Sequence, residues 1–201
     1  MKLNKKIIVI TGGIASGKST VGKILEEKGY QVVESDKIVH KLYKKNSKVY
    51  KCLVSEFGKV VEGEKEINRK KLATIVYGDK SKIKKLNQIV HKYVVKELME
   101  KAKIINQEIV FLDIPLMIEE KERLENHGLI YDEIWLIESP LEMRLERIAN
   151  RDNIGKKEAK KIIENQMKDL KKEEYADEII NNNSDIEKLK KEIEKKLLTL
   201  K

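Results

Sequence analysis

A glycine-rich segment near the start of the chain has residue types and spacing that suit phosphate binding. Residues 12–20 read GGIASGKST and satisfy the pattern G-x-x-x-x-G-K-[ST]. Such glycines let successive backbone N–H groups turn toward phosphate oxygens, the lysine adds a mobile positive charge, and the following hydroxyl can ligate magnesium. An apolar strand pattern before the segment and a helical pattern after it argue against a chance glycine-lysine turn. We therefore expect a nucleoside triphosphate, with Mg²⁺ on Ser19, to contact Gly12, Gly13, Ala15, Ser16, Gly17, Lys18, Ser19 and Thr20.

Two aspartates stand where strands are predicted to end. Asp36 follows the predicted strand 31–35, and Asp113 ends the apolar run 109–113. Ligands of parallel sheets bind beyond the C-terminal ends of the strands, and a kinase needs a carboxylate there to accept the proton of the attacking hydroxyl. A strand-end aspartate more commonly caps the following helix. We favour the catalytic role for Asp36, and both interpretations stay open for Asp113.

Arginine is scarce, and three of the five arginines among 43 basic residues lie close together as Arg144, Arg147 and Arg151. On a helix, offsets of three and seven residues place them along one stripe. Because a guanidinium offers phosphate a planar, bidentate fork, this stripe predicts a clamp over the transferring phosphate. The alternative is ion pairing with acidic neighbours on the same segment: Glu142, Glu146 and Asp152.

The polar, lysine-rich stretch that follows the arginines, to about residue 172, has the composition of a lid. A lid of this kind excludes water, which would otherwise accept the phosphate. The three histidines carry a weaker signal, because no metal-ligand spacing relates them and His91 lies within a helical pattern.

Five predicted strands, separated by helical patterns, position these residues. The strands are expected at 6–11, 31–35, 109–113, 133–137 and 178–181, and an amphipathic helix at 186–198. Strands that alternate with helices imply right-handed crossovers and a parallel sheet with helices on both faces. We therefore predict an α/β, three-layer, P-loop NTPase-like fold with a five-stranded parallel sheet.

Length and composition bound the class of protein. The 201 residues and 40% apolar content allow one sizeable core. No apolar run approaches a membrane span, and Cys52 is alone, so we expect neither a membrane protein nor a disulfide, and a cytoplasmic setting.

The net charge of +9 is concentrated in the middle of the chain. Residues 37–104 carry nineteen basic and seven acidic groups, whereas residues 105–201 carry eighteen basic and twenty-three acidic groups. A nucleic-acid surface, a pocket that steers a polyanionic small molecule and a solvated lysine-rich helical face all fit this distribution.

From near its start to about residue 183, the chain resembles the dephospho-coenzyme A kinase family. The matching segments are TGGIASGKST at 11–20, VESDKI at 33–38, NRKKL at 68–72, DIPLMIE at 113–119, Arg147 with Arg151-Asp152, Gln166, and ADEIINN at 176–182. The phosphate loop occurs in many kinases, but the other segments are more specific and follow in the family's order. The resemblance implies an ATP-dependent enzyme that phosphorylates the ribose 3′-hydroxyl of dephospho-coenzyme A, the last step of coenzyme A synthesis.

The resemblance also implies roles for particular residues. It makes Asp36 the base, Lys18 and Arg147 the other catalytic groups, and Arg151 and Asn182 further nucleotide contacts. The acceptor contacts that it implies are Asp36, Arg69, His91, Asp113, Pro115, Leu116 and Glu119. The implied domains are a nucleotide-binding core at 1–36, 105–145 and 171–201, a helical acceptor-binding domain at 37–104 and a lid at 146–170. The implied partner is the small-molecule acceptor, without nucleic acid or membrane, on a monomer or a weak homo-oligomer.

Some residues at the expected site positions depart from the family's pattern. Ala15 replaces a usual glycine, which the loop tolerates if this residue keeps a negative φ. Glu34 replaces the first aspartate of a usual Asp-x-Asp pair, which leaves Asp36 as the better base, and Arg144 stands at a frequent glutamine position, so its catalytic role stays open.

Two alternative functions remain. Another small-molecule P-loop kinase would differ in its acceptor pocket. A nucleic-acid-binding protein would need base-stacking aromatics among the lysines, whereas the aromatic residues of 37–104 fall mostly on apolar helical positions, where core packing explains them.

Overall fold

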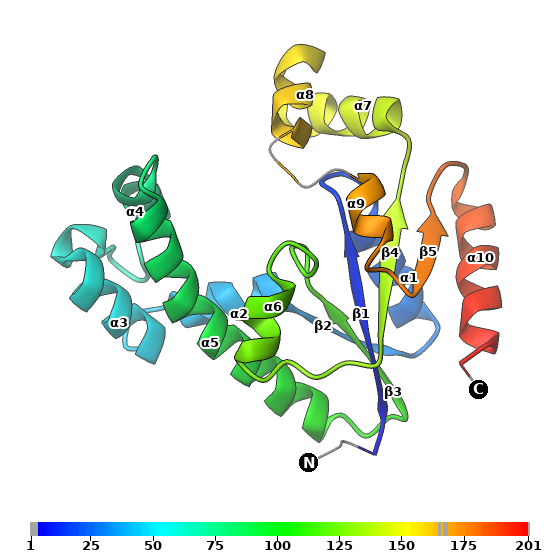
Figure 1. The fold of residues 1–201 in the computed structure, drawn as a ribbon, viewed down its shortest axis with the longest axis horizontal. Helices are drawn as coiled ribbons and strands as arrows, with labels where there is room; N and C mark the ends of the chain where they lie inside the picture. Colours follow the sequence, from blue (N-terminus) through cyan, green and yellow to red (C-terminus); the bar gives the residue numbers. More distant parts are fainter. Residues whose placement is uncertain (1–3, 165, 167–168, 201) are drawn as a thin grey trace. The chain divides into compact units, whose positions relative to one another are not determined.

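The computed structural model describes residues 4–164, 166 and 169–200 of the chain, which form two compact units (Figure 1). The first unit comprises Met1–Val33, Ile105–Lys121 and Tyr131–Lys201, and the second comprises Glu34–Ile104 and Glu122–Ile130. In chain order the elements are β1 (Lys6–Gly12), α1 (Lys18–Glu27), β2 (Gln31–Glu34), α2 (Ser35–Leu42), α3 (Lys48–Phe57), a 3₁₀ turn η1 (Lys59–Val61), α4 (Arg69–Val76), α5 (Lys80–Ile104), β3 (Ile109–Asp113), α6 (Lys121–Asn126), β4 (Glu133–Glu138), α7 (Leu141–Asp152), α8 (Lys156–Glu164), α9 (Asp169–Glu173), β5 (Glu178–Asn181) and α10 (Ile186–Leu198).

The five strands form one sheet in the order β2-β3-β1-β4-β5. The central strand β1 pairs in parallel with β3 on one side and with β4 on the other, and β4 pairs in parallel with β5. The predicted five-stranded α/β sheet is confirmed. Because β1 is central, the glycine-rich turn that follows it leaves the sheet at its middle, beyond the C-terminal ends of the strands.

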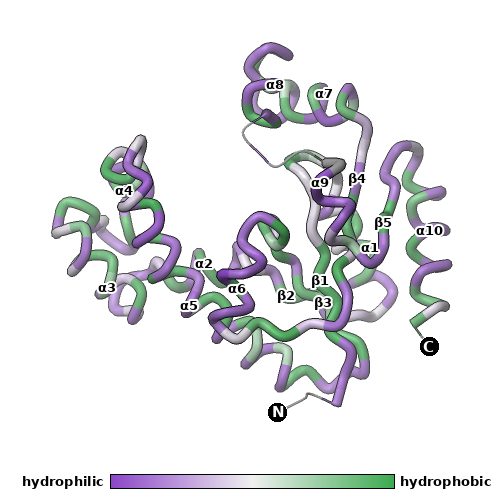
Figure 2. The backbone as a smooth tube through the Cα atoms, viewed as in Figure 1, coloured by the Kyte–Doolittle hydropathy of each residue, from purple (hydrophilic) through white to green (hydrophobic). Residues whose placement is uncertain are grey.

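The central strands β1, β3 and β4 are mostly apolar and are buried on both faces of the sheet (Figure 2). Ile8 and Ile10 of β1, with Phe111 and Trp135 from the neighbouring strands, pack against α1 and α10. Along β1 the intervening residues, such as Val9, are equally buried. Trp135 is fully buried, as predicted for a core residue.

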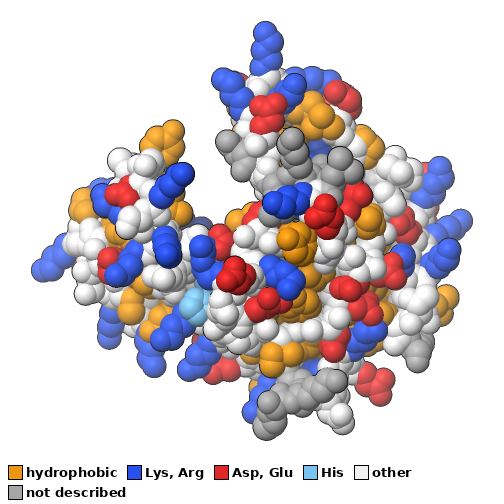
Figure 3. All heavy atoms as spheres, in the orientation of Figure 1, with side chains coloured by type: hydrophobic (Ala, Val, Ile, Leu, Met, Phe, Trp, Pro, Cys, Tyr) orange, Lys and Arg blue, Asp and Glu red, His pale blue; other side chains and the backbone are white. Residues whose placement is uncertain are grey.

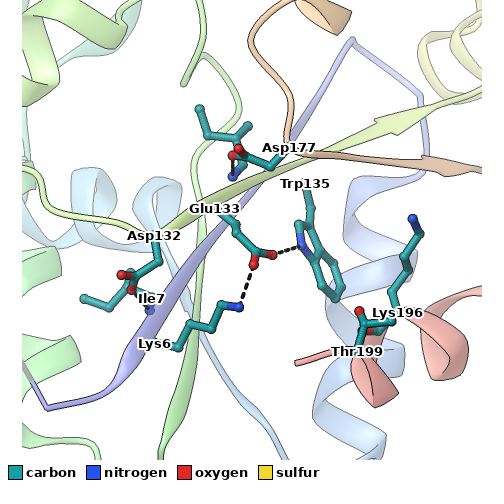
Figure 4. A network of polar contacts seen from close by, with 9 residues as sticks. Lys6, Ile7, Asp132, Glu133, Trp135, Asp177, Lys196 and Thr199 are labelled. Atoms are coloured by element: carbon teal, nitrogen blue, oxygen red, sulfur yellow. Dashed lines mark hydrogen bonds and ion pairs between the residues drawn. The ribbon is translucent and has the colours of Figure 1, made fainter. Parts of the chain in front are cut away.

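Carboxylates at the N-terminal ends of the strands hold the sheet in register (Figure 4). Asp132 accepts the backbone N–H of Ile7, and Asp177 accepts that of Ile134, each at 2.7 Å. Glu133 accepts the indole N–H of Trp135 at 3.0 Å and pairs with Lys6. These carboxylates are therefore engaged in structural contacts.

The second unit is helical, as the sequence of residues 37–104 predicts. Its longest helix, α5, contacts α2, α3 and α4. The apolar faces of these helices form a core that includes Leu53, Val61, Leu72 and Leu98, all almost fully buried. Lysines and arginines lie over α3, α4 and α5 on the face shown in Figure 3. Tyr77, which is 88% exposed, is an exception to the predicted burial of the aromatic residues in this segment.

Across residues 4–164, 166 and 169–200, no helix has the length and apolar character that crossing a membrane requires.

Candidate phosphate-binding site

The predicted phosphate loop connects β1 directly to α1. Strand β1 ends at Gly12, α1 begins at Lys18, and the N-cap residue Gly17 adopts φ +96°, a conformation that favours glycine. No side chain caps the helix. The first N–H groups of α1 therefore meet the loop together with the positive end of the helix dipole, which is the arrangement that binds anions.

The backbone of Ala15 does not meet the condition under which the sequence suggested that an alanine is tolerated here. That condition was a negative φ, and Ala15 adopts φ +60°. The turn geometry that glycine usually supplies is kept although a methyl group is present. This left-handed conformation costs an L-residue about 1 kcal/mol, so other contacts must hold the loop in place.

Lys18 and Asp113 form an ion pair at the C-terminal ends of β1 and β3. Both side chains are largely buried, at 16% and 9% exposure. The sequence left open whether Asp113 has a capping or a functional role. In the structure its carboxylate is a partner of the phosphate-loop lysine.

Two arginines of α7 donate to carbonyl groups of the phosphate loop. Arg144 Nε donates to the Ile14 carbonyl at 2.9 Å, and Arg147 Nη1 donates to the Ala15 carbonyl at 3.0 Å. Arg147 Nη1 also donates to Ser139 Oγ at 3.1 Å. The third arginine of the stripe forms a bidentate pair with Asp152 at 2.8 Å, so the ion-pair alternative holds for Arg151.

Asn182 lies against the phosphate loop at the end of β5. Its side-chain amide donates to the Ser16 carbonyl at 2.8 Å and occupies the space that a side chain at Gly17 would need. The same asparagine lines a cavity of about 400 Å³ beside the loop. The cavity is lined by Ala15, Gly17, Ser19, Thr20, Arg147, Arg151, Asn182, Ser184 and Ile186. The structure thus brings together the loop residues with Arg147, Arg151 and Asn182 around one cavity.

The segment that follows β3 contains the predicted acceptor contacts of the first unit. The Pro115 carbonyl accepts a hydrogen bond from Thr11 Oγ1 at 3.0 Å, and Leu116 is 45% exposed. Glu119 Oε1 lies 2.7 Å from Lys172 Nζ, and the Lys172 side chain is only 2% exposed. Glu119 therefore pairs with a buried lysine that follows the predicted lid.

The remaining predicted acceptor contacts lie in the second unit. Asp36 is exposed in the first turn of α2, and its carboxylate makes no hydrogen bond or ion pair with any residue that the structure describes. His40 lies one turn further along α2, where Arg69 Nη2 donates to its Nδ1 at 3.0 Å. The Arg69 guanidinium also lies over the Tyr43 ring, 5.2 Å from its centroid.

His91 lies within α5 and has a different environment. Burial is the main cause that lowers its pKa to about 4, and the nearby charges of Arg123 and His127 lower the pKa further. His91 is therefore neutral near pH 7, which agrees with the expectation of a packed histidine.

Comparison with known proteins gives one consistent family. A family model described as dephospho-CoA kinase matches residues 6–188. A dephospho-CoA kinase of Fusobacterium nucleatum is 40% identical over 94% of this chain and 95% of the relative. One of Streptococcus agalactiae is 38% identical over the same shares of the two chains. The chain belongs to the dephospho-CoA kinase family.

Solved structures agree with the dephospho-CoA kinase assignment. A crystal structure of a Thermus thermophilus protein is similar with a TM-score of 0.82 and 30% identity, over 98% of each chain. The dephospho-CoA kinase of Campylobacter jejuni is similar with a TM-score of 0.62 and 28% identity, over 98% of this chain and 97% of that one. A shikimate kinase of Acinetobacter baumannii, at 15% identity, shares the fold.

In this member of the dephospho-CoA kinase family, two residues make contacts at the site that the sequence did not predict. Ser139, which directly follows β4, accepts from Arg147 and donates to the Asn182 carbonyl at 2.8 Å. The strand-end rule applied to Asp36 and Asp113 would have found it. Gln166, which supported the resemblance, accepts the N–H of Ile14 in the phosphate loop at 2.7 Å. This contact could not be inferred from the place of Gln166 in a polar stretch.

Proposed function

We propose that the protein transfers the γ-phosphoryl group of ATP to the 3′-hydroxyl of the ribose in dephospho-coenzyme A. The observation that carries this proposal is the cavity that residues of the phosphate loop share with Arg147 and Arg151, in a chain of the dephospho-CoA kinase family. The products are coenzyme A and ADP. Family membership supports the choice of acceptor.

On the donor side, the N–H groups at the start of α1 bind phosphate oxygens and Lys18 neutralises their charge. Lys18 reaches the phosphates by exchanging its partner Asp113 for a phosphate oxygen. Arg147 lines the cavity and has further donors on its guanidinium, which can face the transferring phosphoryl group.

Magnesium fits this site through Ser19. Ser19 is exposed and lines the cavity. Mg²⁺ usually binds few protein oxygens and keeps waters and substrate phosphates as its other ligands. Among the residues that the structure describes, no cluster of three histidine, cysteine or acidic residues offers an all-protein metal site. When bound, the ion would neutralise charge on the phosphates during transfer.

On the acceptor side, Asp36 acts as the general base. Its exposed carboxylate is available to accept the proton of the attacking hydroxyl, because it is not engaged with any described residue. As the hydroxyl oxygen bonds to the γ-phosphorus, the bond between that phosphorus and the β–γ bridging oxygen breaks, and ADP leaves. Arg69 presents donors beside His40, where an anionic part of the acceptor can bind.

A coupled ADP-release assay with purified protein, ATP and Mg²⁺ tests the proposed function. Dephospho-coenzyme A is the first acceptor, and shikimate and nucleosides are the comparisons. We expect turnover with dephospho-coenzyme A alone. Turnover with a different acceptor and none with dephospho-coenzyme A would overturn the proposal.

Two variants test the proposed roles of Lys18 in phosphate binding and of Asp36 in proton acceptance. Lys18→Ala should abolish most turnover, and a near-normal rate would contradict the phosphate-loop assignment. Asp36→Asn should lower kcat by about 10²–10⁴-fold and leave ADP binding unchanged, because the base acts only on the acceptor. Glu62→Gln, a change of the same kind elsewhere in the second unit, is the control.

A further inference from the structure

Both backbone polar groups of Ile14 in the phosphate loop are held by side chains from the two ends of the segment that contains α7 and α8. The Ile14 N–H donates to Gln166 Oε1 at 2.7 Å, and the Ile14 carbonyl accepts from Arg144 Nε at 2.9 Å. Gln166 follows α8 and Arg144 lies on α7, so the two contacts come from opposite ends of the α7–α8 segment. One residue of the loop is thus tied to both ends of that segment.

The side chain of Arg144 packs tightly against the phosphate loop. It is one of the few buried charged side chains among the described residues, at 2% exposure. Its guanidinium occupies the place of a side chain at Gly13, since a Cβ built there would lie 2.4 Å from Nη2. The absence of a side chain at Gly13 therefore leaves room for Arg144.

The loop also packs against the same helices through apolar contacts. Ile14 and Ala15 pack on a cluster formed by Leu145 and Ile148 of α7 and Ala159 of α8. These contacts and the two hydrogen bonds of Ile14 surround the residue that precedes the strained Ala15. The loop conformation, with its positive φ at an alanine, thus depends on the α7–α8 segment.

We propose that Arg144 and Gln166 are positioning residues, which fix the Ile14 peptide and so hold the phosphate loop in the geometry that binds nucleotide. The proposal rests on the proposed function, because it concerns the donor side of the same reaction. Neither residue needs to touch the substrate. Substitution of either residue should therefore weaken nucleotide binding and leave the affinity for the acceptor unchanged.

The test compares Gln166→Leu and Arg144→Met with the unmodified protein. Calorimetry with ADP measures nucleotide affinity, and hydrogen exchange measures protection of the Ile14 amide without nucleotide. Loss of one hydrogen bond should weaken ADP binding about fivefold in Gln166→Leu, and more in Arg144→Met, which loses a charged donor. Gln166→Leu should also expose the Ile14 amide to faster exchange.

Two further variants separate positioning from general destabilisation. Gln166→Glu retains an acceptor oxygen and should keep the Ile14 amide protected. Gln31→Leu makes the same change of residue type at an exposed site on β2 and should behave as the unmodified protein. In the kinetic assay, Gln166→Leu should raise the KM for ATP and leave the KM for dephospho-coenzyme A unchanged.

Unchanged ADP affinity or unchanged Ile14 exchange in Gln166→Leu would overturn the proposal, as would an equal rise of both KM values. If Arg144→Met does not fold, Gln166→Leu decides alone, because the side chain of Gln166 is only half-buried. Calorimetry and exchange need no acceptor. A protein that binds ADP but does not phosphorylate dephospho-coenzyme A would refute the proposed function and leave the positioning result intact.

Discussion

Ala15 shows how a single residue can carry a conformational cost within a binding loop. Its φ of +60° is disfavoured for any residue with a Cβ, and the surrounding contacts of Arg147 and the α7–α8 cluster hold it there. Within the loop the strain is confined to Ala15, because the other residue with a positive φ, Gly17, has no Cβ.

Ala15→Gly should therefore stabilise the protein. Removal of the Cβ relieves the left-handed conformation, and we expect the free energy of unfolding to rise by about 1 kcal/mol. Thermal unfolding should show an increase in Tm of about 2–4 °C for a chain of this size. Ala73→Gly, at an exposed position of α4, is the control and should lower stability by about 1 kcal/mol. An unchanged or lower Tm for Ala15→Gly would contradict the strain argument.

Lys172 is a second residue whose contacts affect the stability of the fold, because its side chain is buried with a counter-charge from a distant segment. It is the only lysine among the described residues that is almost fully buried, and its partner Glu119 belongs to the segment after β3. Burying a charge is costly unless a counter-charge accompanies it. The pair thus joins α9 to the segment that contains Pro115 and Leu116.

Lys172→Met should lower the free energy of unfolding by about 3 kcal/mol, because it leaves the Glu119 carboxylate without its counter-charge. Lys171→Met, at the exposed neighbouring position, is the matched control and should change stability by less than about 0.5 kcal/mol. Urea unfolding of both variants measures the difference. Equal stabilities of the two variants would show that the pair contributes little.

At the scale of elements, the environment of His91 on α5 makes part of the stability depend on pH. The pKa of His91 is about 4 in the folded protein and about 6.5 when the residue is exposed. Between these values the unfolded chain binds the proton and the folded chain does not. The contribution of His91 to the free energy of unfolding should therefore be fully present above about pH 6.5 and should be lost as the pH falls toward 4.

His91→Gln should remove this contribution. Tm measured from pH 7.5 to 4.5 should fall less steeply in the variant than in the unmodified protein. The same slope in both proteins would mean that other groups titrate instead. Because His91 is partly exposed, we expect a shallower slope than a fully buried histidine would give.

The elements could be predicted from the sequence to a large extent because their signals are local. The tail helix at 186–198 has the predicted bounds, and the five strands fall within a residue or two of their apolar runs. The site could be predicted only in part, because several of its contacts join distant segments. The burial of Lys172, which lies in a polar stretch typical of a solvated helix, depends on Glu119, 53 residues earlier in the chain.

The conformation of the phosphate loop also depends on contacts with distant segments, which the sequence does not reveal. A phosphate loop is predicted from its glycines, but the positive φ of Ala15 is not, because the contacts around it come from α7 and α8. The α7 arginines were predicted as a phosphate clamp. Their partners in the structure are loop carbonyls for Arg144 and Arg147, and Asp152 for Arg151. The clamp role of Arg147 stays a prediction.

At the scale of the whole molecule, the uneven charge predicts how substrate binding responds to salt. Residues 37–104 hold an excess of twelve positive charges, from nineteen basic and seven acidic groups. If this excess attracts the polyanionic acceptor, the KM for dephospho-coenzyme A should rise several-fold as NaCl increases from about 50 to 300 mM, because salt screens exposed charges. Steady-state kinetics at saturating ATP measure this, with sucrose as an uncharged control. A KM independent of salt would assign the lysines to solubility alone.

The burial of Lys172 gives the protein a chemical reporter. Reagents that acylate amines react with accessible lysines first, and every other lysine that the structure describes is more exposed. Acylation of Lys172 should therefore be the slowest, and its rate should follow the opening of the contact between α9 and Glu119. Mass spectrometry of peptides from briefly labelled protein would then read how often this part of the chain opens, with no substitution in the sequence.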